Sequence, residues 1–301
     1  MLETLQRQFE IPGIVRIEPG NGGLTRLVIT SPQAAAEIYL HGAHVTRFEP
    51  AGQRPVLWMS RRSWFEPGKP IRGGVPICFP WFGPKPNDPA APTHGLVRLR
   101  QWTIESVRHD SAAGAVIATL SFRSDASTRA FWPGDFLIRH IVTVGPSLQM
   151  RLEVTNTSTQ SIRFDEALHT YLAVGDIREV FVEGLGGTTY LDKAGGQSTQ
   201  RQQIDPQIRF TGETDRVYFD TQATCVVHDP QFRRRIQIEK SGSNATVVWN
   251  PWIAKARSMP DFGDDEWPGM VCVETVNALK HAVELQPGQT HAMAARVTVL
   301  P

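Results

Sequence analysis

Hydrophobic and polar residues alternate along most of this chain. The alternation is strict across 148–155 and recurs in the segment 115–124. A period of two places successive side chains on opposite faces of a strand, with one face packed and the other in water. Further strand-like segments, separated by Gly, Asn and Pro, continue to the end of the chain. The pattern therefore predicts an all-β protein built as one large antiparallel β-sandwich.

One short helix departs from the strand pattern. Leu2, Leu5 and Phe9 recur at helical spacing, which predicts a helix at the start of the chain. No low-complexity linker and no short repeat divides the remainder, and turn signals recur throughout it. We therefore predict a single sandwich domain over residues 1–301, with 1–20 as an N-terminal extension.

Composition narrows the classes of partner. The 31 Lys and Arg residues balance 30 Asp and Glu residues, which leaves a net charge of +1 and no basic excess to attract a nucleic acid. The three cysteines, Cys78, Cys225 and Cys272, form no CxxC, which favours a reducing compartment over a disulfide framework. The N-terminus lacks signal-peptide features, and no apolar run approaches ~20 residues. We expect a cytoplasmic monomer without a membrane or nucleic-acid partner.

The stretch 72–98 has a different composition. It holds six prolines and four glycines together with Arg72, His94 and Arg98. Proline fixes φ and keeps a segment out of helices and central strands, so we expect a long, stiffened loop that presents polar groups. The Gly-Gly pair at 73–74 would let a ligand approach the backbone. Long ordered loops are usually functional, and a Pro-rich surface crossing without function is the alternative.

Two residues downstream of this loop have the chemistry of proton transfer. Glu274 lies beside valines in the strand-like segment 270–277. On a packed face, desolvation would raise its pKa and make it a base near neutral pH, whereas on a wet face it would be an ordinary solvated glutamate. His169 can exchange a proton near neutral pH, or it can be a core histidine bonded to the backbone. The spacing leaves both alternatives open.

Other chemistries lack their motifs. The sequence has no P-loop, no GxGxxG ahead of a helix and no GxSxG, so neither a nucleotide cofactor nor a serine nucleophile is indicated. His41 and His44 form an HxxH, but in a strand they point to opposite faces and no third ligand is evident nearby. We therefore predict no cofactor and no catalytic metal centre.

Six short motifs follow one another along the chain: IRGGVPICFPWFGP, THGLVR, ALHTYL, TYLDK, VVWNPW and DFGDDEWPGMVCVET. Together they resemble the hexose-6-phosphate mutarotases, which are the glucose-6-phosphate 1-epimerases of the aldose 1-epimerase superfamily. The resemblance spans the chain from Gly22 to the C-terminus. It implies a galactose mutarotase-like β-supersandwich, an isomerase of carbohydrate metabolism and no cofactor.

The resemblance also implies roles for individual residues. His169 and Glu274 would be the catalytic pair. The residues that would bind the substrate are Arg72, His94, Arg98 and Asp192. Thr93 stands where some members of the family have a glutamine, so a substrate contact from that position is not implied.

The implied reaction interconverts the α and β anomers of an aldohexose 6-phosphate, with glucose 6-phosphate as the best match. A small-molecule sugar phosphate would be the partner, because guanidinium groups suit its charge. Three alternatives remain: a non-catalytic carbohydrate-binding or sugar-phosphate sensor on the same scaffold, a free-sugar aldose 1-epimerase, and a hydrolase or lyase. The last would need a second carboxylate, for which Asp165 and Glu166 are the candidates.

Overall fold

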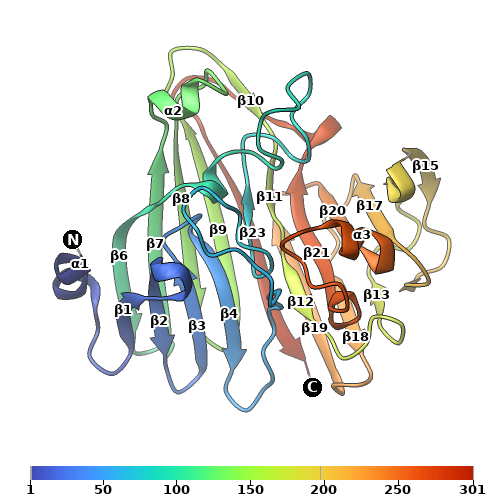
Figure 1. Cartoon of the computed structure of the whole chain (residues 1–301), viewed down its shortest axis with the longest axis horizontal. Coiled ribbons are helices and arrows are strands. Elements are labelled where there is room, and N and C mark those ends of the chain that lie inside the picture. Colours follow the sequence, from blue (N-terminus) through green and yellow to red (C-terminus); the bar gives the residue numbers. More distant parts are fainter. Residues whose placement is uncertain (1, 197, 301) are drawn as a thin grey trace.

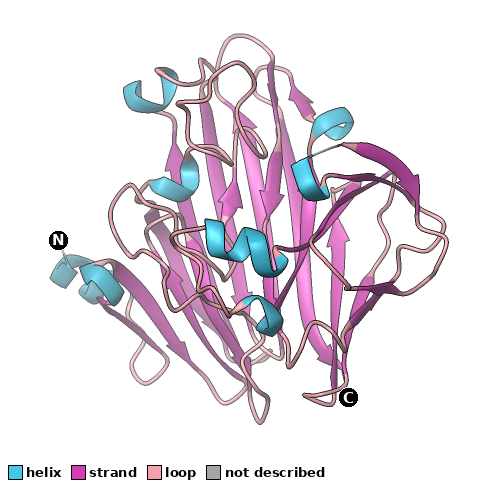
Figure 2. Ribbon diagram, turned by 45° about the vertical axis from the view of Figure 1, so that its right-hand side comes forward, coloured by secondary structure: helices cyan, strands magenta, loops and turns pink. Residues whose placement is uncertain are grey.

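The computed structural model describes residues 2–196 and 198–300. Most of this part of the chain is antiparallel strand, and only short segments are helical (Figure 2). The predicted alternation is confirmed, because buried apolar residues alternate with exposed or half-buried polar ones across 148–155. Strands with one apolar face must cover one another, and they do so here in two large sheets. The predicted all-β sandwich is therefore confirmed.

The larger sheet has nine strands among the described residues. In order across the sheet they are β16 (Ile208–Arg209), β13 (Phe181–Glu183), β18 (Cys225–Asp229), β19 (Arg234–Ser241), β23 (Thr290–Leu300), β9 (Ser147–Asn156), β8 (Phe136–Val144), β7 (Ala115–Arg123) and β6 (Thr103–Asp110). Its long central strands carry the strict alternation, and the side chains of β8 that point inward are buried.

The second sheet has eight strands among the described residues. They are β15 (Thr199–Gln202), β14 (Thr189–Asp192), β17 (Thr214–Phe219), β20 (Ala245–Asn250), β21 (Met270–Asn277), β11 (Glu166–Leu168) and β5 (Ile77–Cys78), with β12 (Tyr171–Ala173) also paired to β21. This sheet is shorter and more irregular than the first. Several of its strands have only two to four residues because loops enter and leave it to build a cavity.

The remaining elements lie around these two sheets (Figure 1). The smaller sheets are β1 (Val15–Pro19), β2 (Thr25–Thr30), β3 (Ala34–Tyr39) and β4 (His44–Pro50), and a pair formed by β10 (Ile162–Phe164) and β22 (Val283–Leu285). The α-helices are α1 (Leu2–Phe9), α2 (Ala126–Arg129) and α3 (Trp252–Ser258). The predicted N-terminal helix is therefore confirmed. Across 2–196 and 198–300, no helix has the length and hydrophobicity needed to traverse a membrane.

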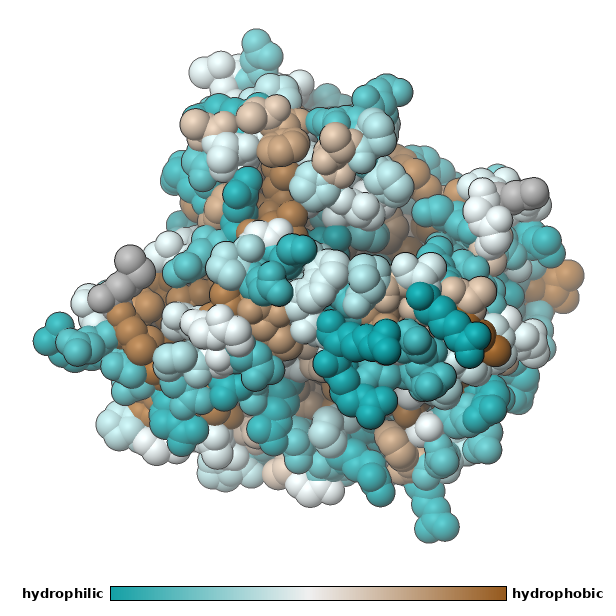
Figure 3. All heavy atoms as spheres, viewed as in Figure 1, coloured by the Kyte–Doolittle hydropathy of each residue, from teal (hydrophilic) through white to brown (hydrophobic). Residues whose placement is uncertain are grey.

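Two strands of the eight-stranded sheet are buried on both faces. Every residue of β20 and of β21 is buried, although polar residues occur in both. One face of these strands packs into the core of the sandwich. The other faces the cavity, and α3 lies over it (Figure 1). A space-filling view of this side of the molecule is mostly hydrophilic, with hydrophobic residues in the recesses (Figure 3). Polar groups on the cavity face of β21 are therefore withdrawn from water.

Candidate active site

His169 and Glu274 face each other across a strand pair. β11 and β21 pair with Leu168 opposite Thr275. One step further in this register places His169 opposite Glu274, on the same face of the sheet. The His169 Nδ1 lies 3.4 Å from the Glu274 Oε1. Both side chains are buried, with 6% and 2% of their surfaces exposed. The sequence left the burial of Glu274 open, and the structure resolves it in favour of the desolvated position.

Burial moves the two groups in opposite directions. Desolvation, reinforced by the charge of Asp215, raises the pKa of Glu274 well above its usual value. Desolvation, followed by the charges of Arg72 and Arg98, lowers the pKa of His169 well below its usual value. Both shifts disfavour charge in the empty cavity. The pair can thus hold one shared proton near neutral pH, on either partner.

Tyr171 fixes the imidazole of His169. It lies two residues further along the same face, and the two rings stack with centroids 4.7 Å apart and planes at 9°. The Tyr171 hydroxyl accepts a hydrogen bond from Arg72 Nη1 at 3.0 Å. This stack leaves one edge of His169 toward Glu274 and holds the ring orientation that proton transfer needs.

His94 reaches the cavity from the loop. Its φ of +62° lies in the left-handed region, and its ring makes an edge contact with His169 at a centroid distance of 5.5 Å. The backbone N–H of Gly83 donates to the His94 Nδ1 at 3.2 Å. An imidazole that accepts at Nδ1 carries its proton on Nε2, so neutral His94 is a hydrogen-bond donor from that atom.

The two arginines have different environments. Arg72 donates from Nε and Nη2 to the two carboxylate oxygens of Asp261, each at 3.2 Å, in addition to its bond with Tyr171. Arg98 donates to the carbonyl oxygen of Thr93 at 2.6 Å, and its Nε is buried without a hydrogen-bond partner. Among the described residues, no carboxylate lies within ion-pair distance of Arg98. The cavity therefore has an arginine whose charge is balanced and one whose charge is not.

These groups surround one cavity of about 470 Å³. Its walls bring together the predicted residues His169, Glu274, Arg72, His94 and Arg98. They come from the loop 72–98, from the junction of β11 and β12, and from β21. The volume is within the usual range for a small-molecule site. The arrangement combines a desolvated acid–base pair, a neutral donor and an unbalanced positive charge.

The structure does not bring Asp192 into this cavity. In the pairing of β14 with β17, Asp192 lies opposite Arg216, so both point to the face away from Asp215. Its carboxylate lies 3.6 Å from Arg201 Nε. The cavity wall instead contains Asp215 and Lys193, which the sequence reasoning missed. The motif TYLDK marked the correct strand, but a shift of one residue exchanges the faces.

One further expectation about a sequence feature needs correction. The glycines at 73–74 have positive φ, but a Cβ at Gly73 would meet the Trp58 carbonyl oxygen at 2.4 Å and one at Gly74 would meet the Val45 carbonyl oxygen at 2.3 Å. They permit close packing of backbone against backbone, and neither lines the cavity.

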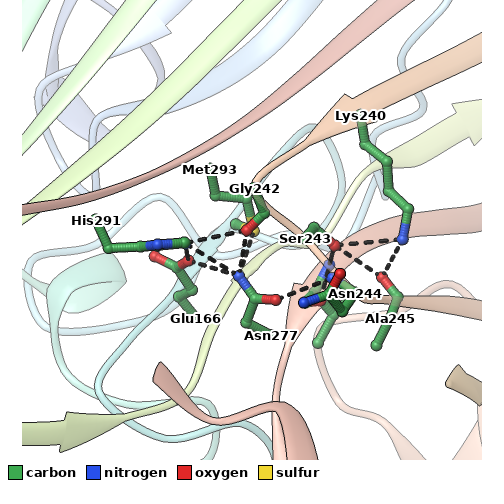
Figure 4. Close-up of polar contacts among 10 residues, drawn as sticks. Glu166, Lys240, Gly242, Ser243, Asn244, Ala245, Asn277, His291 and Met293 are labelled. Carbon is green, nitrogen blue, oxygen red and sulfur yellow. Dashed lines mark hydrogen bonds and ion pairs between the residues drawn. The ribbon is translucent and has the colours of Figure 1, made fainter. Parts of the chain in front are cut away.

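A second glutamate–histidine pair lies on the opposite face of β11 and β21 (Figure 4). The Glu166 Oε1 lies 2.9 Å from His291 Nε2 and accepts a hydrogen bond from Asn277 Nδ2, also at 2.9 Å. Asn277 also donates to the carbonyl oxygen of Gly242 at 2.7 Å. Neither Glu166 nor its neighbour Asp165 lines the cavity, so the second carboxylate that a hydrolase would need is not supplied by either of them.

Comparison with known proteins gives consistent matches along nearly the whole chain. A family model described as aldose 1-epimerase matches residues 25–298. A Salmonella typhimurium protein with the provisional name glucose-6-phosphate 1-epimerase is 36% identical over 302 residues, covering 97% of this chain and 100% of that protein. An Escherichia coli protein of the same provisional name is 36% identical over 279 residues, covering 91% of this chain and 92% of that one.

Solved structures agree with these matches. A crystal structure from Salmonella typhimurium, provisionally described as a mutarotase, superposes with a TM-score of 0.89 at 32% identity, covering 97% of this chain and 95% of that one. A galactose mutarotase-like protein from Clostridium acetobutylicum superposes with a TM-score of 0.75 at 12% identity, covering 95% and 98% of the two chains. The second likeness shows the fold alone.

Proposed function

The chain belongs to the aldose 1-epimerase family, and on that premise we propose that it interconverts the α and β anomers of an aldohexose 6-phosphate, with glucose 6-phosphate as the best match. One observation carries the proposal. His169 and Glu274 lie 3.4 Å apart, buried, in a cavity whose wall includes an arginine without a carboxylate partner. Anomer exchange needs an acid and a base at one carbon, and a phosphate needs a positive charge.

The acid–base pair performs both halves of the reaction. Glu274 takes the proton from the hydroxyl on C1 while protonated His169 gives a proton to the ring oxygen. The C1–O5 bond breaks and an open-chain aldehyde forms. Rotation about C1–C2 presents the other face of the carbonyl, and closure reverses both transfers. The pair begins and ends with one shared proton, so this exchange requires no net uptake or release. Each well-placed group contributes about 10²–10⁴-fold to the rate.

Arg98 is the group best placed to hold the phosphate. Its Nε has no hydrogen-bond partner, and no carboxylate of the described residues lies within ion-pair distance of it, so an anion would satisfy both. Arg72 already holds Asp261 and Tyr171, and it orients the stack on His169. We assign Arg72 mainly to positioning, although the resemblance implies the same substrate-binding role for both arginines.

Phosphate binding also favours the ionised form of the catalytic pair. In the empty cavity the positive charges of Arg72 and Arg98 add to desolvation in disfavouring the imidazolium of His169. A phosphate carries close to two negative charges at neutral pH and would offset that positive charge. His169 then accepts the shared proton more readily, and Glu274 becomes the carboxylate base. The phosphorylated sugar thus promotes its own reaction.

The remaining contacts would fix the sugar ring. Neutral His94 offers its Nε2 proton to a ring hydroxyl or to O5. Asp215 and Lys193 can bind hydroxyl groups from the opposite wall, and we propose Asp215 in the place expected for Asp192. Trp249 also lines the cavity and can pack against the apolar face of the ring.

Anomer exchange of glucose 6-phosphate, followed by magnetisation transfer in NMR, tests the proposal. The protein should accelerate exchange over buffer and should act more weakly on free glucose. Equal action on both sugars would support a free-sugar epimerase instead. Saturable binding of the sugar phosphate with no acceleration would support a non-catalytic sensor, and the proposal would then be wrong.

A further inference from the structure

Cys272 is a buried thiol next to the catalytic pair. It lies two residues before Glu274 on the same face of β21, directly opposite Tyr171 in β12. None of its surface is exposed. A ring nitrogen of His169, the Cys272 Sγ and a Glu274 carboxylate oxygen all lie within 4.8 Å of one another. The other cysteines, Cys78 and Cys225, take part in no such group among the described residues.

Two atoms of this cluster are unsatisfied. The His169 Nδ1 and the Glu274 Oε2 are buried and have no hydrogen-bond partner. Buried polar groups normally find a partner, because leaving one unpaired is unfavourable. A sugar hydroxyl can pair with atoms that face the open cavity. A thiol is only a weak hydrogen-bond partner for a hydroxyl group. The proposed anomer exchange therefore assigns no role to the thiol of Cys272.

From these contacts we infer that His169, Cys272 and Glu274 form a binding site for a thiophilic divalent metal ion, with Zn²⁺ as the best match. Tetrahedral zinc with its usual bond lengths separates nitrogen and oxygen ligands by about 3.3 Å. The observed separation of His169 Nδ1 and Glu274 Oε1 is 3.4 Å. A sulfur ligand lies about 3.5 Å from the other two. Because the three ligand atoms lie within 4.8 Å of one another, each sulfur separation needs to shorten by no more than about 1.3 Å.

The ligand types select the ion. One imidazole, one thiolate and one carboxylate suit zinc or cadmium, whereas Mg²⁺ and Ca²⁺ require sets of oxygen ligands. Cys272 loses its proton to solvent on coordination, so thiolate and carboxylate together balance the charge of the ion. Arg72 is already balanced by Asp261, and Lys255 by Glu213, which leaves Arg98 and Lys193 as the cations of the cavity wall that would repel the ion. His169 and Glu274 line the cavity, so a fourth coordination position is open to water.

The metal occupies both proton-transfer groups and therefore blocks anomer exchange. Zinc would be a reversible inhibitor that competes with the sugar phosphate for the same residues. The inhibition rests on the proposed function, but binding of the metal does not. A direct spectroscopic measurement of binding therefore separates failure of one proposal from failure of the other.

Cadmium is the probe of choice, because a cadmium–thiolate bond has an ultraviolet charge-transfer band. We expect this band on titration of the metal-free full chain with Cd²⁺. It should persist in Cys78→Ala and Cys225→Ala, which are matched controls for loss of a buried free cysteine. It should disappear in Cys272→Ala, with Cys272→Ser as a second variant of nearly unchanged volume. Saturating glucose 6-phosphate should suppress the band in the wild type.

Activity provides the second measurement. Zn²⁺ should inhibit exchange, and a chelator should restore it. Cys272→Ala and Cys272→Ser should retain basal exchange and need more than about tenfold more zinc for the same inhibition. A band that survives in both folded Cys272 variants, or equal zinc sensitivity with and without the thiol, would overturn the inference. If the wild type shows the band but never catalyses exchange, the proposed function fails and the metal site stands.

Discussion

Two glutamate–histidine pairs lie on opposite sides of the eight-stranded sheet. The cavity pair, His169 and Glu274, is 3.4 Å apart without an aligned hydrogen bond, and each partner retains an unsatisfied atom. In the interior pair, Glu166 of this sheet lies 2.9 Å from His291 of β23 in the nine-stranded sheet and is tied to Asn277 (Figure 4). The Glu166 Oε2 is buried without a partner, but its Oε1 contacts both His291 and Asn277. The same two residue types thus lack a mutual hydrogen bond in one place and share one in the other.

The difference in contacts produces opposite electrostatics. The hydrogen bond that His291 donates to the Glu166 carboxylate raises the pKa of His291, which stabilises its charged form. Desolvation and two arginines lower the pKa of His169, which disfavours its charge. A hydrogen-bonded pair that lines no cavity supports the fold, whereas a pair at the cavity without a mutual hydrogen bond can give its proton to a ligand. The contrast separates a structural pair from a reactive one by their contacts alone.

The largest expected effect is on the chemistry of the cavity pair. Glu274→Gln removes the base but keeps the shape of the side chain. Anomer exchange of glucose 6-phosphate should fall by about 10²–10⁴-fold, because a general base typically contributes that much. Sugar-phosphate binding, measured by calorimetry, should be largely retained. NMR exchange rates at saturating substrate are the readout.

The matched control is the same substitution in the interior pair. Glu166→Gln should leave exchange within a few-fold of the wild type, provided that the variant is folded, because Glu166 does not line the cavity. Full activity in Glu274→Gln would remove Glu274 from the role of base. Equal loss of exchange in both folded variants would show that the two faces are not functionally distinct.

The next effect concerns the charge that surrounds the cavity pair. Arg98→Gln should weaken binding of glucose 6-phosphate by about 10–100-fold, because a hydrogen bond to a charged group contributes about 1.5–3 kcal/mol. Free glucose should bind as it does to the wild type. Calorimetric titration of both sugars gives the comparison.

Substitution of Arg72 should differ from substitution of Arg98 in its selectivity for the phosphorylated sugar. Arg72→Gln removes the bonds to Asp261 and Tyr171, so it should impair exchange of phosphorylated and free sugars to a similar degree. Selective loss of the phosphorylated sugar in Arg72→Gln, with no selectivity in Arg98→Gln, would reverse the two assignments.

The sequence predicted the fold, and five of the six candidate site residues line one cavity, for identifiable physical reasons. Strict alternation along β9 reports directly which side chains are buried, and His169 and Glu274 belong to motifs whose residue types suit proton transfer. Which side chains of a short, irregular strand face the cavity was harder to predict. The resemblance of TYLDK implied Asp192, but in a strand of four residues the sequence does not show which side chains face the cavity, and Asp215 of the neighbouring strand lies there instead.

Contacts between distant segments were not predictable either. Arg72 and Asp261 are 189 residues apart, and only the folded chain shows that this arginine is balanced while Arg98 is not. The tautomer of His94 likewise depends on a backbone N–H from the other side of its loop. Glu166 and Glu274 are both strand glutamates, and the sequence alone does not show that their side chains lie on opposite faces of the sheet. Their opposite faces give them different functions.

A smaller effect is expected on stability at the interior pair. Glu166→Gln should lower the free energy of unfolding by about 1–3 kcal/mol, because a buried charged hydrogen bond is weakened while the neighbouring donors remain. The exposed pair Arg151–Glu153 on β9 is the matched control, and Glu153→Gln should change stability by no more than about 1 kcal/mol. Urea unfolding followed by circular dichroism gives both values. Equal changes in the free energy of unfolding would mean that the interior network stabilises the fold no more than an exposed ion pair does.

The smallest effect is the pH dependence of that difference. The folded-state pKa of His291 is raised above its usual value of about 6.5 by Glu166, with the Gly242 carbonyl oxygen as a further acceptor. A raised pKa contributes stability that is fully present below the unfolded-state pKa and is lost as the pH rises through the folded-state pKa. The stability gap between wild type and Glu166→Gln should therefore be largest near pH 6 and shrink toward pH 9. Urea unfolding across this range measures it, and a gap that widens with pH would mean that His291 is not held in its charged form.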